Sequence, residues 1–293
     1  MTQILKSLSD VSSQYDTLFC DLWGCLHNGR APYPAAVAAL QSFRRQGGHV
    51  VLLTNAPRPS AAVIATLDRM GVPRDAWDLV VSSGDAAQYA MLSGAVGQKV
   101  WHLGPDKDDG FFNDLPADLD PTPITRVALE EAEGIVCTGP FNELTEAPED
   151  YRARFLYAKT KGLKLLCANP DLVVDMGDKR IYCAGALAAL YAEMGGTSLY
   201  FGKPHPPIYD LARRRLAALT GLSPDEGKIL AIGDGIGTDV QGAVGENIDG
   251  LFVTGGLAAD EFGDDVENPD PARLDSWLAD QQLSPAYSIG RLR

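Results

Sequence analysis

The 293-residue sequence is poor in basic residues and has no long apolar segment. With 25 Lys and Arg against 39 Asp and Glu, its formal net charge is −14. This charge disfavours nucleic acid and anionic membrane surfaces as partners, so we expect neither. No apolar run approaches the ~18 residues of a membrane-spanning helix, and the polar stretch from Met1 to Asp10 does not resemble a signal peptide. An anionic substrate is not excluded, because a bound divalent cation reverses the field locally.

The sequence also lacks paired cysteines. Its five cysteines form no C-x-x-C pair, and most of them lie in apolar runs. This pattern favours reduced, buried thiols over a zinc site or disulfides. Free thiols are typical of a reducing compartment, so we expect a cytoplasmic protein. The five are Cys20, Cys25, Cys137, Cys167 and Cys183.

Strand-like and helix-like segments alternate through the first part of the chain. Short apolar, β-branched runs predict buried strands, and apolar residues at helical spacing predict the helices between them. This βαβαβ order predicts a parallel sheet with right-handed crossovers. The strands are expected at 17–20, 49–54 and 79–81, and the helices at 34–46 and 60–70.

A second series of the same kind begins near the last third of the chain, with strands expected at 198–201, 229–232 and 251–253. The fold class predicted is therefore α/β, a doubly wound parallel-sheet core interrupted by an inserted α/β domain. We expect the core to comprise residues 1–82 and 197–293, and the insert to comprise residues 83–196. The acidic stretch 260–275 is expected to be a solvated face.

Polar residues follow four of the expected strands. Asp21 ends the first, Thr54 and Asn55 end the second, and Lys203 and Asp234 follow two strands of the later series. Each alone is explained by a turn, a cap or a solvated lysine. Together they indicate one site, because ligands bind at the carboxyl ends of parallel strands. An aspartate nucleophile, a hydroxyl, a lysine and Mg²⁺-binding carboxylates are what phosphoryl transfer needs.

Four motifs resemble those of the haloacid dehalogenase (HAD) superfamily, and within it the class IIA, NagD-like hydrolases. The resemblance covers nearly the whole chain and implies a HAD-like Rossmannoid core. The insert lies where that class carries its cap domain. The motifs are Asp21-Leu22-Trp23-Gly24, Leu53-Thr54-Asn55, Gly202-Lys203-Pro204 and Gly233-Asp234 with Thr238-Asp239, and the segments 168–171 and 183–187 resemble cap segments.

The resemblance implies a Mg²⁺-dependent phosphohydrolase that acts on a small phosphorylated metabolite, such as a sugar phosphate, through an aspartyl-phosphate. Asp21 would be the nucleophile, Thr54 and Asn55 would bind the phosphoryl group, and Lys203 would neutralise charge. We expect Lys203 to matter for phosphate affinity rather than for folding. The implied metal-site residues are Asp21, Trp23 through its carbonyl, Asp234 and Asp239.

The cap is expected to choose the substrate, which the sequence does not identify. A tight turn with ordinary helix packing explains the candidate cap contacts equally well, and a homodimer is left open. These candidates are Asn169, Asp171, Arg180 and Gly185.

Trp23 departs from the family pattern, because phosphatases of the superfamily carry there the Asp that acts as general acid and base. His27 either replaces that acid or has a structural role in the loop. The alternative to a weak or specialised enzyme is a phosphometabolite-binding protein with little turnover. Dinucleotide binding through the glycines that begin at Gly233 fails, because the fingerprint needs Gly where Thr238 stands.

Overall fold

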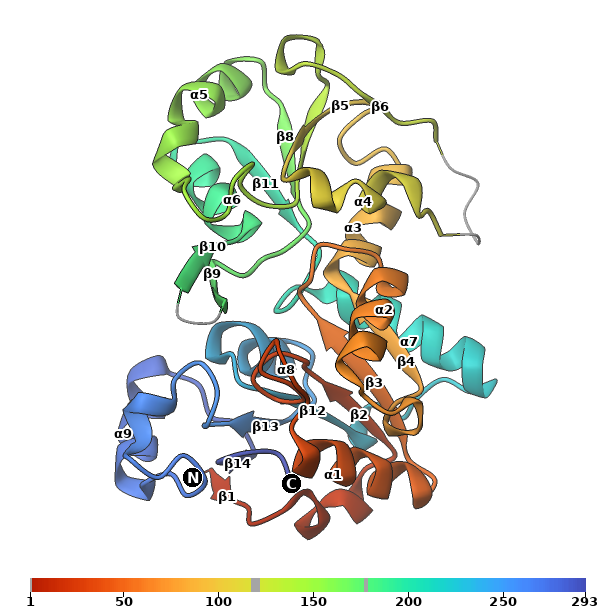
Figure 1. Cartoon of the computed structure of the whole chain (residues 1–293), viewed down its shortest axis with the longest axis vertical. Helices are drawn as coiled ribbons and strands as arrows, with labels where there is room; N and C mark the ends of the chain where they lie inside the picture. Colours follow the sequence, from red (N-terminus) through yellow and green to blue (C-terminus); the bar gives the residue numbers. More distant parts are fainter. Residues whose placement is uncertain (1, 117–121, 177–178) are drawn as a thin grey trace. The chain divides into compact units, whose positions relative to one another are not determined.

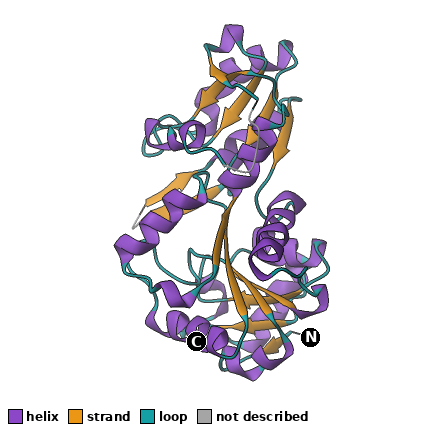
Figure 2. Ribbon diagram, turned by 90° about the vertical axis from the view of Figure 1, so that its right-hand side faces the viewer, coloured by secondary structure: helices purple, strands orange, loops and turns teal. Residues whose placement is uncertain are grey.

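The computed structural model describes residues 2–116, 122–176 and 179–293 (Figure 1). The chain divides into two compact units. Unit 1 contains Met1–Thr54, Ile64–Val81 and Lys203–Arg293, and unit 2 contains Asn55–Val63 and Ser82–Gly202. Each unit has its own parallel sheet accompanied by helices (Figure 2), so the predicted α/β class is confirmed.

Unit 1 is built on a seven-stranded sheet in the order β1-β14-β13-β12-β2-β3-β4. Neighbouring strands from β1 to β3 in this order pair in parallel. Its strands are β1 (Gln3–Ile4), β2 (Thr17–Cys20), β3 (His49–Thr54), β4 (Leu79–Ser82), β12 (Ile229–Gly233), β13 (Asp249–Val253) and β14 (Tyr287–Ile289). The helices of this part of the chain are α1 (Pro34–Arg45), α2 (Ser60–Met70), α7 (Pro206–Thr220), α8 (Gln241–Gly245) and α9 (Pro271–Gln281).

The order in which the chain adds strands to the sheet of unit 1 reverses between β2 and β12. The chain continues from β2 to its neighbour β3 on one side, and from β12 to its neighbour β13 on the other. β2 and β12 themselves pair in register from Thr17 with Ile229 to Cys20 with Ile232. Ligands bind beyond the carboxyl ends of strands at such a switch point. The fold thus selects the ends of β2 and β12 as the place for a site.

Local sequence explains why these elements form. β2 is buried throughout and mostly apolar because both faces of a central parallel strand are covered, and Leu18 and Cys20 are fully buried. α1 starts with Pro34, which suits the first helical position, and buries Leu40 and Phe43. α7 ends at Gly221, whose φ of +76° is the left-handed conformation of a helix C-terminus.

Unit 2 has a five-stranded parallel sheet in the order β11-β8-β7-β5-β6 and a separate antiparallel hairpin of β9 and β10. An aromatic row through Tyr151, Phe155 and Tyr191 fills the core between α5, α6 and the sheet. The strands are β5 (Lys99–Leu103), β6 (Thr125–Arg126), β7 (Gly134–Cys137), β8 (Lys164–Cys167), β9 (Val173–Met176), β10 (Lys179–Tyr182) and β11 (Thr197–Tyr200). The helices are α3 (Ser83–Leu92), α4 (Gly110–Asn113), α5 (Arg152–Thr160) and α6 (Ala184–Glu193).

The expected domain limits differ from these units at the second boundary. β11 was expected to open the second part of the core at residue 197, but it pairs with β8 in the sheet of unit 2. The chain therefore returns to unit 1 at Lys203 rather than at 197. The sequence of a single parallel strand does not indicate which sheet it joins, and for this reason β11 was assigned to the core. The segment 55–63 likewise groups with unit 2, although it was expected in the core.

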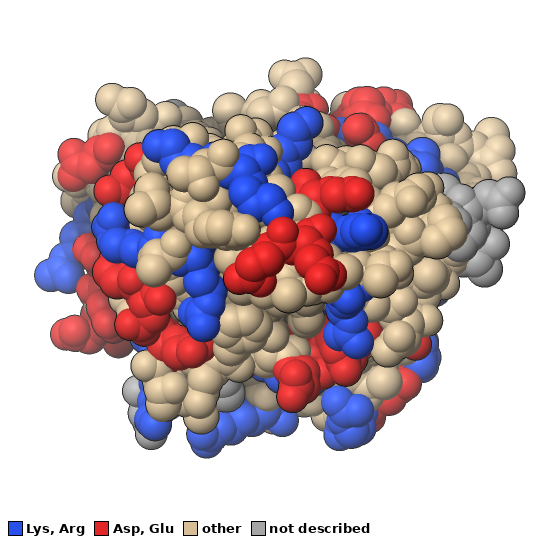
Figure 3. Space-filling view, turned by 90° about the horizontal axis from the view of Figure 1, so that it is seen from above, with Lys and Arg blue, Asp and Glu red and all other residues tan. Residues whose placement is uncertain are grey.

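The acidic stretch 260–275 is more than a solvated face. Phe262 and Leu274 are buried in a cluster with Phe252, and the Phe252 ring stacks on Trp277 with centroids 5.7 Å apart. The charges lie on the other side of an amphipathic segment. Acidic and basic side chains are mixed over the face of the molecule shown in Figure 3. Among the described residues, no helix is both long and apolar enough to cross a membrane.

Candidate active site

Asp21 and Asp234 leave two adjacent strands at the same edge of the sheet. The Asp21 amide donates to the Ile232 carbonyl at 2.8 Å, which extends the pairing of β2 with β12 by one residue. Asp234 follows β12 directly, and Thr54 closes β3, the other neighbour of β2. All three polar side chains are buried. The strand ends therefore bring together side chains that are distant in sequence.

Lys203 joins two carboxylates of unit 1. Its Nζ donates to Asp21 Oδ1 at 2.7 Å and to Asp239 Oδ1 at 2.6 Å. Only 3% of Lys203 is exposed. Burial alone would lower the pKa of this ammonium, but the two carboxylates outweigh burial and raise its pKa well above the usual value. Lys203 is therefore a fixed positive charge beside Asp21.

Asp239 faces Lys203 and a backbone amide. Its Oδ2 accepts a hydrogen bond from the Gly235 amide at 3.1 Å, and a Cβ on Gly233 would lie 2.0 Å from its Cγ. Burial raises the pKa of Asp239 to about 6, against the opposing effect of Lys203. Asp239 therefore orients Lys203. Asp239 was predicted to support the metal site, and it would do so by holding Lys203 beside Asp21.

Asp234 occupies a space that two glycines leave open. A Cβ on either Gly24 or Gly256 would lie 2.0 Å from Asp234 Oδ2. The same oxygen accepts a hydrogen bond from the Leu257 amide at 2.9 Å. Burial, and then the nearby carboxylates of Asp21 and Asp239, raise the pKa of Asp234 well above its usual value. This carboxylate is held in place but lacks enough positive charge around it.

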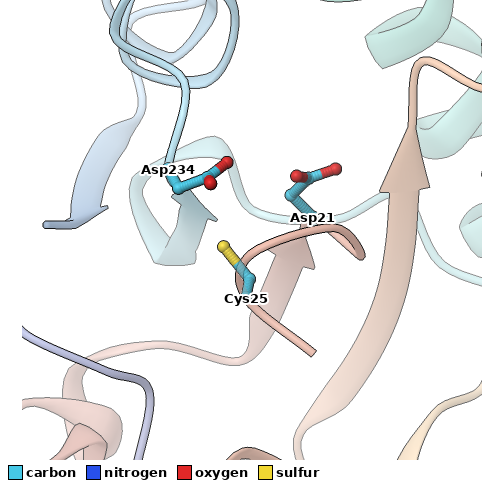
Figure 4. Close-up of side chains that lie close together, drawn as sticks. All are labelled: Asp21, Cys25 and Asp234. Carbon is cyan, nitrogen blue, oxygen red and sulfur yellow. The ribbon is translucent and has the colours of Figure 1, made fainter. Parts of the chain in front are cut away.

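The site can hold a divalent cation. One ligand atom from each of Asp21, Cys25 and Asp234 lies within 4.8 Å of the other two, and Figure 4 shows the three side chains approaching one another. The three carboxylates of Asp21, Asp234 and Asp239 face a single ammonium, that of Lys203, which leaves two formal negative charges. A divalent cation would neutralise this excess, and hard oxygen donors suit Mg²⁺.

Cys25 is the member of this cluster that the sequence did not reveal. All five cysteines are free and buried, as expected. Because burial is common to all five, it does not distinguish the one that lies beside the carboxylates. The available signal was its position four residues after Asp21, in the same loop. Gly24 lets that loop turn back with a φ of +75°, which an L-residue adopts poorly.

Trp23 and His27 pack on each other in this loop. Their rings meet edge to face with centroids 5.5 Å apart, and Trp23 also covers Gly29, where a Cβ would lie 2.3 Å from its ring. His27 Nδ1 accepts a hydrogen bond from the Gly29 amide at 3.1 Å. Burial lowers the pKa of His27 to about 4, so it is neutral near pH 7. This environment favours the structural role of His27 over that of a substitute acid.

Asn55 contacts a residue of the predicted cap group. Its Nδ2 donates to Asp171 Oδ1 at 2.8 Å, and both residues belong to unit 2. A Cβ on Gly202 would lie 2.5 Å from Asn55 Oδ1, so glycine is needed there for close packing. Asp171 therefore fixes the orientation of the Asn55 amide, which is a more specific role than the sequence suggested.

The remaining predicted cap residues lie around the same turn or on the hairpin. Asn169 Oδ1 accepts a hydrogen bond from the Asp171 amide at 3.0 Å. Gly185, at the start of α6, packs so closely that a Cβ would lie 2.1 Å from the Pro170 carbonyl oxygen. Arg180 is exposed on β10. A hydrogen bond within the turn thus gives Asn169 a structural role, and close packing does so for Gly185.

The burial of Lys203 changes the expectation that it matters for phosphate alone. In Lys203→Met, Asp21 and Asp239 would lose their buried partner, and removing one partner of a buried pair costs about 3 kcal/mol or more. We expect a clearly lower urea midpoint at pH 7.5. Lys228→Met is the matched control, because Lys228 pairs with Asp16 at the surface, where 50% of its side chain is exposed, and such pairs contribute less than about 1 kcal/mol.

The stability lost in Lys203→Met should become smaller as the pH falls. An aspartate whose pKa is raised in the folded state binds its proton more tightly folded than unfolded, so its contribution to stability falls as pH rises through that range. Burial already raises the pKa of Asp239, and the Lys203 ammonium opposes this. The variant should therefore regain stability relative to the parent between pH 7.5 and pH 5. Equal urea midpoints for the variant and the parent at pH 7.5 would contradict this account of Lys203.

Comparisons with known proteins agree with this geometry. The haloacid dehalogenase-like hydrolase family matches residues 18–115, and the related HAD-hydrolase-like family matches residues 200–277. A crystal structure of a haloacid dehalogenase-like hydrolase from Brucella suis is 37% identical, with a TM-score of 0.85. That comparison covers 99% of this chain and 100% of the other.

Two curated relatives are more distant. A D-glycerol 3-phosphate phosphatase from Mycobacterium tuberculosis is 25% identical over 85% of this chain, which spans 66% of the relative's length. A 4-nitrophenylphosphatase from Schizosaccharomyces pombe is 22% identical over 87% of this chain and 89% of the relative. The family matches and the close structural likeness establish what the motifs implied: the chain is a hydrolase of the haloacid dehalogenase superfamily, with the α/β insert of class IIA, the NagD-like group.

Proposed function

We propose that the protein is a Mg²⁺-dependent phosphatase that acts on a small phosphorylated metabolite, such as a sugar phosphate, with Asp21 as nucleophile. The observation that carries the proposal is the Asp21 carboxylate at the β2–β12 switch point, bonded to Lys203 and next to Asp234. The two curated relatives are named as phosphatases, which supports this reaction class.

The proposed reaction has two displacements at phosphorus. A carboxylate oxygen of Asp21 attacks the phosphorus while the bond to the ester oxygen breaks, and the leaving group departs with the electron pair. Water then attacks the aspartyl-phosphate, releases inorganic phosphate and restores Asp21. Lys203 neutralises charge on the nucleophile and the phosphoryl oxygens, because its fixed ammonium already contacts Asp21.

Other residues would hold the phosphoryl group and the cation. We assign phosphoryl binding to Thr54 and Asn55. Asp21, Asp234 and the Trp23 carbonyl would hold Mg²⁺, which when bound supplies charge neutralisation at the phosphoryl oxygens. Asp239 acts on this site through Lys203, with which it forms a hydrogen bond.

Trp23 makes turnover weak or specialised in this proposal. It occupies the position of the family's general acid, and its ring packs on His27 and Gly29. His27 is neutral near pH 7 because burial lowers its pKa to about 4. A leaving group would therefore depart largely unprotonated. This observation also supports the second candidate, a phosphometabolite-binding protein with little turnover.

The cap residues and the location complete the proposal. Arg180, exposed on β10, stays a candidate substrate contact, whereas Asp171 would act through Asn55. Asn169 and Gly185 would shape the turn between them. The five free cysteines support a location in the reducing cytoplasm.

A turnover screen tests the proposed function. Phosphate release from a panel of sugar, alkyl, acyl and aryl phosphates is measured with and without Mg²⁺. We expect at least one ester to be hydrolysed only with Mg²⁺, and Asp21→Asn to reduce that rate to the buffer background. Lys228→Met, which removes a surface ion pair with Asp16, serves as the unaffected control. Binding of an ester without Mg²⁺-dependent release would favour the binding protein instead.

The role of Trp23 is tested by leaving-group dependence. The parent should hydrolyse aryl phosphates much faster than alkyl phosphates. Because a positioned general acid contributes about 10²–10⁴-fold, Trp23→Asp should accelerate an alkyl ester far more than an aryl ester. Trp23→Ala removes the ring without supplying an acid and should accelerate neither. Comparable, efficient rates on both esters in the parent would mean that another acid already acts.

A further inference from the structure

The loop after β2 places a thiol among the carboxylates of the site. Cys25 Sγ lies within 4.8 Å of a carboxylate oxygen of Asp21 and of one of Asp234. In Figure 4 its sulfur points toward Asp234, and Asp21 lies beside them. Only 1% of Cys25 is exposed. This geometry gives the site a sulfur donor in addition to its oxygen donors.

Backbone hydrogen bonds hold the thiol in this position. The Leu26 and His27 amides both donate to the Leu22 carbonyl, at 2.8 and 3.0 Å, and the Gly24 amide donates to the His27 carbonyl at 2.9 Å. These bonds close the loop around Cys25. The donor set is therefore built by the fold before any cation binds, which lowers the conformational cost of binding.

We propose that Cys25 makes this a mixed sulfur–oxygen site that binds borderline and soft divalent cations, such as Zn²⁺, Co²⁺ or Cd²⁺, with Cys25 Sγ as a direct ligand. Thiolate ligands select such metals, whereas Mg²⁺ uses oxygen ligands. Coordination converts the thiol to a thiolate and releases its proton to solvent.

This inference rests on the cation site of the proposed function but not on phosphatase activity. It predicts two modes of metal binding at one place. Mg²⁺ would use the oxygen donors, and a zinc-like cation would add the sulfur. Since both modes use Asp21 and Asp234, the two kinds of cation compete, and Zn²⁺ would displace Mg²⁺ from the nucleophile.

Cobalt spectroscopy of the full-length, metal-free protein tests the proposal. Titration with Co²⁺ should produce a near-ultraviolet sulfur-to-cobalt charge-transfer band that is absent from Cys25→Ala. Cys20→Ala is the matched control, because Cys20 is equally buried and adjoins Asp21, yet its thiol donates to the Asp21 carbonyl oxygen rather than joining the cluster. The control should retain the band.

Calorimetry gives a second readout. Loss of the sulfur ligand should weaken Zn²⁺ binding at least as much as loss of an outer-shell partner, which costs about 10- to 100-fold in affinity. Mg²⁺ affinity should stay within a few-fold. Cys25→Ser keeps the side-chain volume and provides the same comparison if Cys25→Ala does not fold. X-ray absorption of the zinc-loaded parent needs no variant and should show a sulfur neighbour at about 2.3 Å.

The outcomes separate this inference from the proposed function. Co²⁺ that binds without the band, a band that survives in Cys25→Ala, or zinc with oxygen and nitrogen neighbours alone would overturn the role of Cys25. Mg²⁺-dependent hydrolysis would then remain intact. Failure of both Mg²⁺ and Co²⁺ to bind would overturn the cation site itself, and with it both proposals.

Discussion

The contact between the Lys203 ammonium and the Asp21 and Asp239 carboxylates is the interaction on which the site depends. Without it, three buried carboxylates would face one another at a strand edge with no ammonium to offset them. The ion pair places one positive charge between the Asp21 and Asp239 carboxylates. Burial and the carboxylates of Asp21 and Asp239 still raise the pKa of Asp234 well above its usual value, so a cation beside it would stabilise its charged form.

The backbone makes this crowding possible by removing side chains. Gly24 and Gly256 come from loops after two different strands, and both leave the space that Asp234 fills, while Gly233 leaves room for Asp239. A single added methyl group at any of them would lie 2.0 Å from a carboxylate atom, far inside van der Waals contact. A substitution at any of these three glycines would therefore disturb both the packing of the loops and the position of a carboxylate of the site.

Much of this arrangement could be predicted from sequence, for physical reasons. β2 and β3 are short, mostly apolar runs, and their limits match the predicted ones. Strand ends placed Asp21 and Asp234 together because parallel strands share one carboxyl edge. β11 was assigned to the wrong sheet, since strand pairing depends on contacts distant in sequence. β1 is too short to leave a periodic signal.

Side-chain direction was harder to predict than position. The motif placed Asp239 at the site, but its pairing with Lys203 depends on atoms that only a folded backbone positions. Cys25 illustrates the same limit, because hydropathy marks a buried cysteine and does not say which groups it faces. Asp171 was one of the candidate substrate contacts, with a tight turn as the alternative, and its hydrogen bond with Asn55 could not be read from the sequence.

The pairing of β2 with β12 also orders events during synthesis of the chain. Thr17 pairs with Ile229, and Gln3 with Tyr287, so strands made first wait for partners made last. Most of unit 2 is one continuous stretch, Ser82–Gly202, which leaves the ribosome before Lys203 does. That stretch can fold while Asp21 is still solvated and unpaired, because domains fold as units as they emerge. An unfinished chain would thus carry a formed cap domain but no reactive centre, and hydrolytic capability would arise only with the final strands.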